Sequence, residues 1–191
     1  MFVLVIWLPV AVHAENMQLD ANLLLTGMSA NGNDLKSGKA IVVNYNYYLN
    51  SWLAVDAGLF VSEKTLDESR EDVVGDYRAS IQAQSILLGI KPRYRFLAPY
   101  EVYGRLGLLY GQTELEVEEY FGAGIPGGKT SAKDKGYGYY ASIGGAHYVT
   151  ENVMVQLEFR YMKQLDVFEG KSRFPFDLTI TALNFGVGYR F

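Results

Sequence analysis

The sequence predicts an all-β fold, an eight-stranded antiparallel up-and-down β-barrel, and three observations lead to this prediction. Eight runs of the chain alternate between apolar and polar residues, which is the period of a strand with two different faces. A motif of an aromatic residue, a tight turn and a new alternating run recurs at residues 48–55, 96–103 and 148–155. Longer polar stretches separate the other runs. Short periplasmic turns and longer extracellular loops are typical of transmembrane barrels.

Each strand is identified by the apolar residues that share one of its faces. They occupy alternate positions within residues 19–25, 41–47, 53–59, 88–96, 106–110, 153–161 and 183–191. The remaining run, residues 137–148, carries glycines and aromatics that fit either parity. The long loops are expected at residues 29–37, 64–79, 118–135 and 167–176. This arrangement places both termini at the end of the barrel that carries the short turns.

Charged residues decide between a membrane barrel and a soluble one. A soluble barrel of the same strand number has its apolar face inside, whereas a membrane barrel has it outside, against lipid. An interior polar network is predicted from the charged residues opposite the apolar face: Asp20, Asp56, Lys91, Arg93, Arg95, Arg105, Glu158, Arg160 and Arg190. Both signs are present, so these charges can pair when buried. Because side chains fill an eight-stranded barrel, we expect a packed ionic core and no open pore.

The last strand carries a predicted assembly signal. Counting back from the end of the chain, Phe191, Tyr189, Val187 and Phe185 form one apolar face. An aromatic end on such a strand is typical of proteins delivered to the outer membrane, so these residues are expected to engage the barrel-assembly machinery. Aromatic residues also crowd the turns and predict an interfacial girdle: Tyr45, Tyr47, Tyr48, Trp52, Tyr94, Phe96, Tyr100, Tyr148, Tyr189 and Phe191.

The beginning of the chain predicts export. Residues 1–14 are an apolar run too short to span a bilayer, and they end on a small-x-small pattern, Val12-His13-Ala14. We interpret them as a signal peptide whose basic N-terminal stretch is missing, followed by one barrel domain at residues 15–191. The absence of Cys excludes a disulfide scaffold, a thiolate metal site and a Cys nucleophile. A net charge of -4 gives no general attraction to nucleic acid.

The chain resembles the small outer-membrane β-barrel superfamily, which includes the barrel domain of outer membrane protein A, outer membrane protein X and the opacity-type adhesins. The resemblance lies in Tyr103-Gly104-Arg105-Leu106-Gly107-Leu108-Leu109-Tyr110, in Leu157-Glu158-Phe159-Arg160-Tyr161 and in the last seven residues. It implies a bacterial outer-membrane location and a salt-bridged plug that includes Arg105, Glu158 and Arg160. It specifies the fold well and the activity poorly.

Candidate chemistry is sparse. Residues 123–130 satisfy a relaxed phosphate-loop pattern but lack the strand and helix that such a loop joins, so no cofactor is expected. The acidic residues at 67–76 lack the spacing of a calcium loop, and no metal site is predicted. His147 is adjacent to a short turn, where an inward or interfacial polar contact is expected. The period-two Glu114, Glu116 and Glu118 and the later lysines Lys133 and Lys135 predict a hairpin that extends beyond the membrane.

The leading hypothesis is a monomeric, non-enzymatic outer-membrane barrel that contributes to envelope integrity or presents its loops to a surface partner. Its other expected contacts are membrane lipid and lipopolysaccharide. Two alternatives are a lipid A-modifying enzyme on the same barrel, which would depend on His147, and a small diffusion channel. No loop carries a dense basic cluster, so a heparin-binding adhesin is not indicated.

Overall fold

The computed structural model describes residues 16–35, 37–71, 75–121, 125–170, 172 and 175–191. The predicted signal peptide, residues 1–14, lies outside these residues. The described part of the chain is built from strands: β1 (Met17–Ala30), β2 (Asn33–Asp34), β3 (Gly38–Tyr48), β4 (Leu53–Ser62), β5 (Thr65–Glu71), β6 (Gly75–Leu97), β7 (Tyr100–Phe121), β8 (Ile125–Tyr148), β9 (Val153–Val167) and β10 (Phe176–Arg190). None of its helices is long and apolar enough to cross a membrane.

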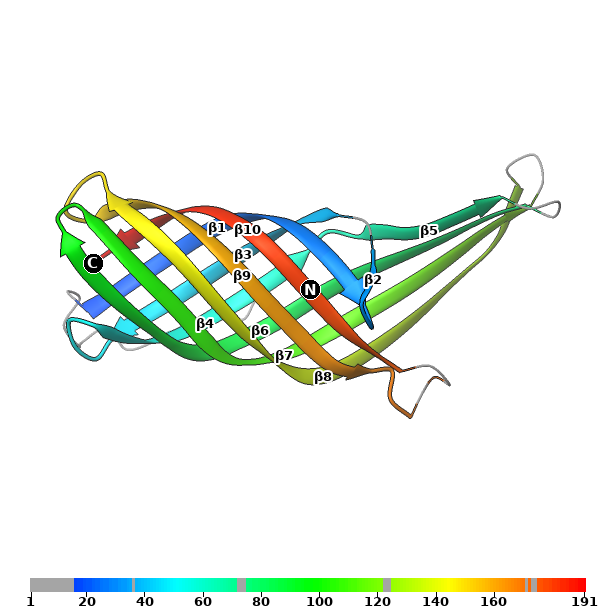
Figure 1. Ribbon diagram of the computed structural model, residues 1–191. Coiled ribbons are helices and arrows are strands. Elements are labelled where there is room, and N and C mark those ends of the chain that lie inside the picture. The colour runs from blue at the N-terminus through cyan, green and yellow to red at the C-terminus, as the bar shows by residue number, and fades with distance from the viewer. Residues whose placement is uncertain (1–15, 36, 72–74, 122–124, 171, 173–174) are drawn as a thin grey trace.

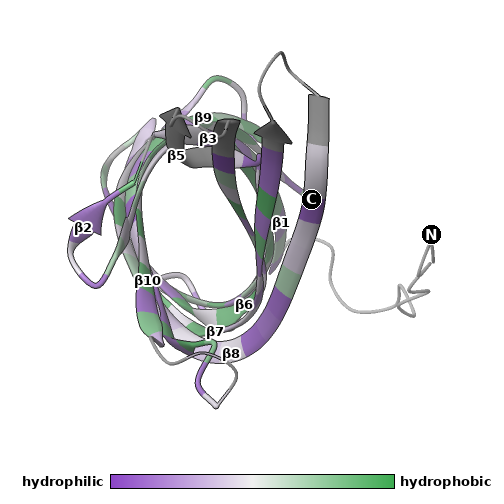
Figure 2. Cartoon of the chain, turned by 90° about the vertical axis from the view of Figure 1, so that its right-hand side faces the viewer, coloured by the Kyte–Doolittle hydropathy of each residue, from purple (hydrophilic) through white to green (hydrophobic). Residues whose placement is uncertain are grey.

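Eight of the strands close a ring. Each of β1, β3, β4, β6, β7, β8, β9 and β10 pairs antiparallel with the next, and β10 pairs with β1. Ala21, for example, lies opposite Val43 on one side and Val187 on the other. Figure 2 shows the ring nearly end-on. The predicted eight-stranded up-and-down barrel is therefore confirmed, with β2 and β5 as two shorter strands beside β1 and β6.

The alternation of apolar and polar residues in the sequence corresponds to the outer and inner faces of the ring. Along β1, for example, Leu19, Leu23 and Leu25 are exposed on the outside, while Asp20 and Leu24 are buried on the inside. The same alternation places apolar side chains of the other ring strands outside, with Leu108 70% exposed. An outer surface of this kind needs an apolar surrounding such as lipid.

The three predicted tight turns all occur, and polar side chains close two of them. Asn50 accepts backbone hydrogen bonds from Trp52 and Leu53 at 3.0 and 2.9 Å between β3 and β4. Thr150 does the same for Asn152 and Val153 at 3.3 and 3.0 Å between β8 and β9. Such side-chain caps hold a short loop in one conformation. We call this end of the ring, which also carries the chain's C-terminus in Figure 1, the short-turn end, and the opposite end the long-loop end.

At the long-loop end, β5, β6, β7 and β8 continue past the other strands as a sheet, the extension (Figure 1). Residues 64–79 and 118–135, predicted as loops, are therefore largely strand. The prediction was wrong because polar residues were assigned to loops, although a strand with water on both faces is also polar. The predicted hairpin extension is confirmed: β7 and β8 remain paired from Tyr100 opposite His147 to Phe121 opposite Ile125.

The structure corrects the aromatic girdle and decides the ambiguous run. Tyr48 points inward, is 2% exposed and donates a hydrogen bond from its hydroxyl to Gln18 Oε1 at 2.8 Å. Tyr148 turns its hydroxyl to Glu101 at 3.1 Å. In β8, Tyr140 is fully buried inside the ring, whereas Tyr137 and Tyr139 are exposed outside. These outer tyrosines contact Tyr110 and Tyr161, with ring centroids 5.0 and 6.2 Å apart, and form an aromatic band toward the long-loop end.

Candidate functional site

The interior at the short-turn end is organised around Arg105 of β7. Its Nη2 donates to Asp20 Oδ2 at 2.6 Å, its Nε to Glu158 Oε2 at 3.0 Å and its Nη1 to Asp56. Nη1 also donates to Asn46 Oδ1 at 3.0 Å. Arg105 is 2% exposed, and the three carboxylates come from β1, β4 and β9. With Asn46 in β3, one planar cation therefore ties five strands together through charge-assisted hydrogen bonds.

Two further cations complete this cluster. Lys91 Nζ lies 3.4 Å from Asp20 Oδ2, and Arg160 Nε lies 2.7 Å from Glu158 Oε1. Neither cation side chain is exposed. The cluster thus holds three cations and the carboxylates of Asp20, Asp56 and Glu158, so its formal charges cancel. Charges can be buried at this density only when they are paired in this way.

The remaining predicted cations lie closer to the rim at the short-turn end. Arg93 Nη1 and Arg95 Nε both donate to Oε2 of Glu101, at 3.2 and 3.1 Å. The side chain of Arg93 is buried, but that of Arg95 is 45% exposed. Arg190 is half-buried, with its guanidinium 5.4 Å from the centroid of the Tyr48 ring. Of the nine predicted interior residues, the structure brings six together around Arg105 and places Arg93, Arg95 and Arg190 apart from them.

Sequence reasoning missed Glu101 and the neutral members of the network. Glu101 is 1% exposed and shares the parity of Tyr103 and Arg105, which is the signal that could have identified it. Asn44 and Asn46 also lie on the inward face, where they donate to Asp56 and Asp20. Tyr140 donates to Asp56 Oδ2 at 2.8 Å. Because the prediction counted only charges, it omitted the amide and hydroxyl donors that a buried carboxylate also requires.

The interior toward the long-loop end is mainly apolar, with a few buried polar side chains such as Thr113 and Gln164, so the expectation of an ionic core holds for one end only. Inward-facing residues of many strands form this apolar layer: Leu24, Met28, Val42, Phe60, Ile81, Leu87, Leu109, Met162, Leu178 and Ile180. They occupy the parity of the charged residues, further along the same strands. Close-packed apolar side chains of this kind exclude water as effectively as the ionic cluster does.

A residue of the β9–β10 loop closes the apolar layer. Phe168 is 6% exposed, packs within this cluster and lies against Phe176 with ring centroids 6.1 Å apart. Its backbone amide donates to Asp134 Oδ2 of β8 at 2.6 Å. Phe168 and Asp166 have φ values of 65° and 51°, a conformation that costs free energy in residues other than glycine. The loop accepts this strain while its aromatic side chain is buried at the mouth of the ring.

The extension is held by ion pairs across its strands. Lys133 of β8 pairs with Glu114 of β7 at 3.0 Å, and Lys129 pairs with Glu116 and Glu118 at 2.8 and 3.1 Å. Lys64 also reaches Glu116, at 2.9 Å. Hydrogen bonds from Lys129, and then from Lys64, lower the pKa of the Glu116 carboxyl below its usual value. Glu116 therefore stays ionised at neutral pH and joins β8 to the segment before β5.

His147 does not lie in a catalytic arrangement within the described part of the chain. It follows Ile143 and Gly145 on the outer face of β8 near the short-turn end, beside Tyr100 with ring centroids 4.9 Å apart. Its Nδ1 has no hydrogen-bond partner among the described residues. A hydrolytic site would need a nucleophile within hydrogen-bond reach of such a base. The described residues also contain no group of three or more His, Cys, Asp or Glu side chains placed to hold a metal ion.

The predicted assembly signal lies in β10, the strand that closes the ring, and in Phe191, which follows it. Phe185, Val187, Tyr189 and Phe191 are all exposed on the outside of the barrel. The rings of Tyr189 and Phe191 meet edge to face with centroids 5.0 Å apart. The amide of Phe191 donates to the carbonyl of Met17 at 3.0 Å, beside the seam between β1 and β10. These residues remain a proposed recognition element for the assembly machinery.

Truncating the last aromatic is expected to impair assembly more than stability. Phe191→Ala should lower the folded yield in the membrane several-fold, because the proposed recognition face loses its terminal ring. Phe159→Ala is the matched control, since Phe159 is 52% exposed on the same outer surface and Phe191 is 49% exposed. Folded yield is measured by heat-modifiable gel migration, and stability by urea unfolding of the protein that folds. Equal yields for the two variants would contradict the proposal.

Comparisons with known proteins agree with this architecture. A family model described as the outer membrane protein beta-barrel domain matches residues 1–191. No curated protein matches the chain significantly.

Among solved structures, the chain is similar to neisserial surface protein A (NspA), with a TM-score of 0.64 and 15% identity over 92% of this chain and 97% of that chain. It is also similar to Ail, the attachment invasion locus protein of Yersinia pestis, with a TM-score of 0.58, 17% identity and coverage of 93% and 99%. For the outer membrane protein OprG of Pseudomonas aeruginosa, the TM-score is 0.55, the identity 14% and the coverage 94% and 97%. At these identities the likeness shows the fold alone.

Proposed function

Because the chain belongs to the outer membrane protein beta-barrel family, we propose that it is a non-enzymatic protein of the bacterial outer membrane that presents the extension to a partner outside the cell. In such barrels the short-turn end is periplasmic and the long-loop end extracellular. The observation that carries the proposal is the extension itself. A protein that only sealed or stabilised the membrane would have no need for strands that continue in register beyond the ring.

The edges of the extension suit it to binding. Among the residues that the structure describes, β5 pairs only with β6, and the pairing of β8 with β9 begins at Gly138 opposite Gln164. Residues 125–137 of β8 therefore have a strand partner on one side only within the described residues. Exposed strand edges can accept an added strand from another protein, and rigid elements that display such surfaces commonly bind partners.

The charge of the extension indicates the kind of partner. Residues 64–79 and 114–135 together carry ten acidic and six basic side chains. One of the similar solved structures is Ail in complex with the heparin analogue sucrose octasulfate. The acidic balance here favours a basic protein surface over a sulfated polysaccharide, because like charges oppose association.

The interior argues against the diffusion-channel alternative. The neutralised ionic cluster around Arg105 and the apolar layer capped by Phe168 lie in series along the ring. Hydrated ions would have to cross both. We therefore propose a plugged barrel that adds to envelope integrity and gives little steady conductance in planar bilayers.

Trimming the extension should abolish partner binding and leave the barrel intact. One variant replaces residues 116–131 with Asn-Gly, which preserves the pairing of Leu115 with Ala132. A second replaces residues 66–80 and preserves the pairing of Thr65 with Ile81. Binding to host cells or matrix and survival in serum are compared with the intact protein, and heat-modifiable migration shows that the ring has folded. Because the two variants remove different segments of the extension, each serves as the control for the other.

The result also separates the two proposed roles. Unchanged binding and serum survival in both trimmed variants would overturn the surface-partner proposal. Detergent sensitivity of cells that lack the protein, rescued equally by intact and trimmed forms, would assign the role to the barrel and envelope integrity.

A further inference from the structure

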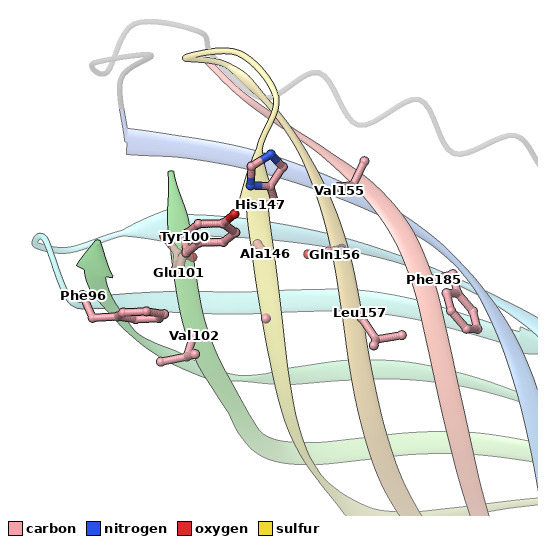
Figure 3. A pocket seen from close by; sticks show the side chains of 11 residues that line it. Phe96, Tyr100, Glu101, Val102, Ala146, His147, Val155, Gln156, Leu157 and Phe185 are labelled. Atoms are coloured by element: carbon pink, nitrogen blue, oxygen red, sulfur yellow. The ribbon is translucent and has the colours of Figure 1, made fainter. Parts of the chain in front are cut away.

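The outer surface of the ring has a groove near the short-turn end, with Val102, His147 and Leu157 around it (Figure 3). Gly145 of β8 also lines this groove. Gly145 follows Ile143 on the outer face and leaves a gap in the row of side chains. A Cβ added at Gly145 would come no closer to another heavy atom than 3.8 Å, the distance to the carbonyl oxygen of Glu101. Val102 of β7 and Val155 and Leu157 of β9 flank the gap. The groove has a volume of about 490 Å³.

The walls of this groove require an apolar occupant. Val102, Val155 and Leu157 are between 43% and 49% exposed, and Phe185 lies further along the groove at 50%. In the membrane this surface faces lipid, where no bulk water is available to fill a hollow. An empty hollow would forfeit dispersion contacts along its whole lining. A hydrocarbon chain has the width and the chemistry to occupy it.

The groove leads to a polar end at the membrane interface. Tyr100 borders the groove together with His147, and it also borders a second hollow of about 370 Å³ between the β6–β7 and β8–β9 turns. Arg95 and Tyr148 line that hollow, with the Arg95 guanidinium 4.3 Å from the centroid of the Tyr148 ring. Tyrosine and arginine at this depth are typical contacts of lipid headgroups.

The polar end of the groove carries a net positive charge beside Arg95. Arg93 and Arg95 share the single carboxylate of Glu101, so these three groups carry a net charge of one cation. Arg95 is the exposed member of the two. Glu151 borders the second hollow as well, and it disfavours an anion on its own side. A phosphate is therefore expected beside Arg95 and Tyr148.

We propose that the groove and the second hollow together bind one phospholipid of the periplasmic leaflet. An acyl chain lies over Gly145 between Val102 and Leu157. The phosphate lies at Arg95, and Tyr100 lies between the two. The short-turn end is the periplasmic end, which places the site in the leaflet opposite the one that carries lipopolysaccharide. The groove selects for a hydrocarbon chain, and Arg95 favours an anionic headgroup such as phosphatidylglycerol.

The test uses the folded full chain extracted from nanodiscs of phosphatidylglycerol or of phosphatidylcholine, with retained lipid counted by native mass spectrometry. Wild-type protein is expected to retain one phospholipid. Gly145→Leu fills the groove and should remove retention of both lipids. Ala141→Leu, which adds the same side chain to the outer face of the same strand, should retain lipid as wild type does. Arg95→Gln should weaken retention of phosphatidylglycerol about fivefold and of phosphatidylcholine less.

The outcomes decide the proposal even where one variant fails to fold. Val102→Phe narrows the groove from its rim and replaces Gly145→Leu if that protein shows no heat-modifiable migration. If wild type, Gly145→Leu and Val102→Phe retain the same amount of lipid, the proposed site is overturned and the retained lipid is bound non-specifically. A species of twice the protein mass that Gly145→Leu abolishes would also overturn it and would identify the groove as a contact between two copies of the chain.

Discussion

Replacing Arg105 with Met should lower the free energy of unfolding by about 3–5 kcal/mol, because it removes one partner of a buried charge cluster. Asp20 would keep Lys91, and Glu158 would keep Arg160. Asp56 would keep only neutral described donors, Asn44 and Tyr140. An ionised carboxylate in that position is costly, so the loss should exceed that of a single hydrogen bond. The measurement is equilibrium urea unfolding in phospholipid vesicles.

Two further variants make the Arg105 result specific. Lys133→Met removes a cation from an ion pair of the extension whose lysine side chain is 56% exposed, and it should cost less than about 1 kcal/mol. Asp56→Asn introduced together with Arg105→Met should recover part of the loss, since the uncompensated charge is then gone. If Arg105→Met costs no more than Lys133→Met, the interior cluster does not stabilise the barrel as described.

Adding a single methyl group at Gly107 should destabilise the barrel by about 1–3 kcal/mol, the usual cost of overpacking a tight interior. Gly107 of β7 lies opposite Gly89 of β6, and the ring of Tyr140 lies against them. A Cβ at Gly107 would lie 2.7 Å from Cα of Gly89 and 2.7 Å from Cε1 of Tyr140. The new Cβ would also collide with the backbone carbonyl oxygen of Leu88 in β6. Relief therefore requires β6 to move as well as Tyr140, and movement of Tyr140 would weaken its hydrogen bond to Asp56. Gly107→Ala therefore disturbs packing and the ionic cluster together.

Gly145→Ala is the matched control for the Gly107 variant. It makes the same substitution in a neighbouring ring strand, at a position where the nearest atom to the new Cβ would be 3.8 Å away. Urea unfolding should show little change for Gly145→Ala and a clear loss for Gly107→Ala. Equal effects of the two substitutions would mean that backbone propensity, and not the contacts with β6 and Tyr140, determines the cost.

Much of the ring was predictable because the alternation of apolar and polar residues within each strand identifies its outward and inward faces. The alternation of Leu19, Leu23 and Leu25 with Asp20 and Asn22 requires no knowledge of any other strand. The same holds for the tight turns, whose Asn50 and Thr150 act on their own neighbours. The extension was only partly predictable. Cross-strand charges indicated β7 and β8, whereas β5 and the start of β6 carry a polar pattern that a loop could equally have.

The sequence predicted which charged residues face the interior, but it did not predict which of them pair with one another. Arg105 and Asp20 are 85 residues apart in the chain, and only ring closure brings them to 2.6 Å. Glu101 could have been included, since it shares the parity of Arg105. The neutral hydrogen-bond donors and the apolar layer could also have been predicted as interior residues, because they share the same inward parity. What no pattern indicated is the insertion of Phe168, because it depends on a strained loop that meets Asp134 of another strand.

The sequence by itself determined which side chains face outward and which inward, where the tight turns lie and that the outer surface is apolar. These properties follow from the two-residue period of a strand, which is local. The tertiary structure decided which charges meet, that the interior is ionic toward the short-turn end and mainly apolar toward the long-loop end, and that a groove opens over Gly145. Those properties depend on the register between strands and on the closure of β1 against β10, which bring together residues distant in the chain.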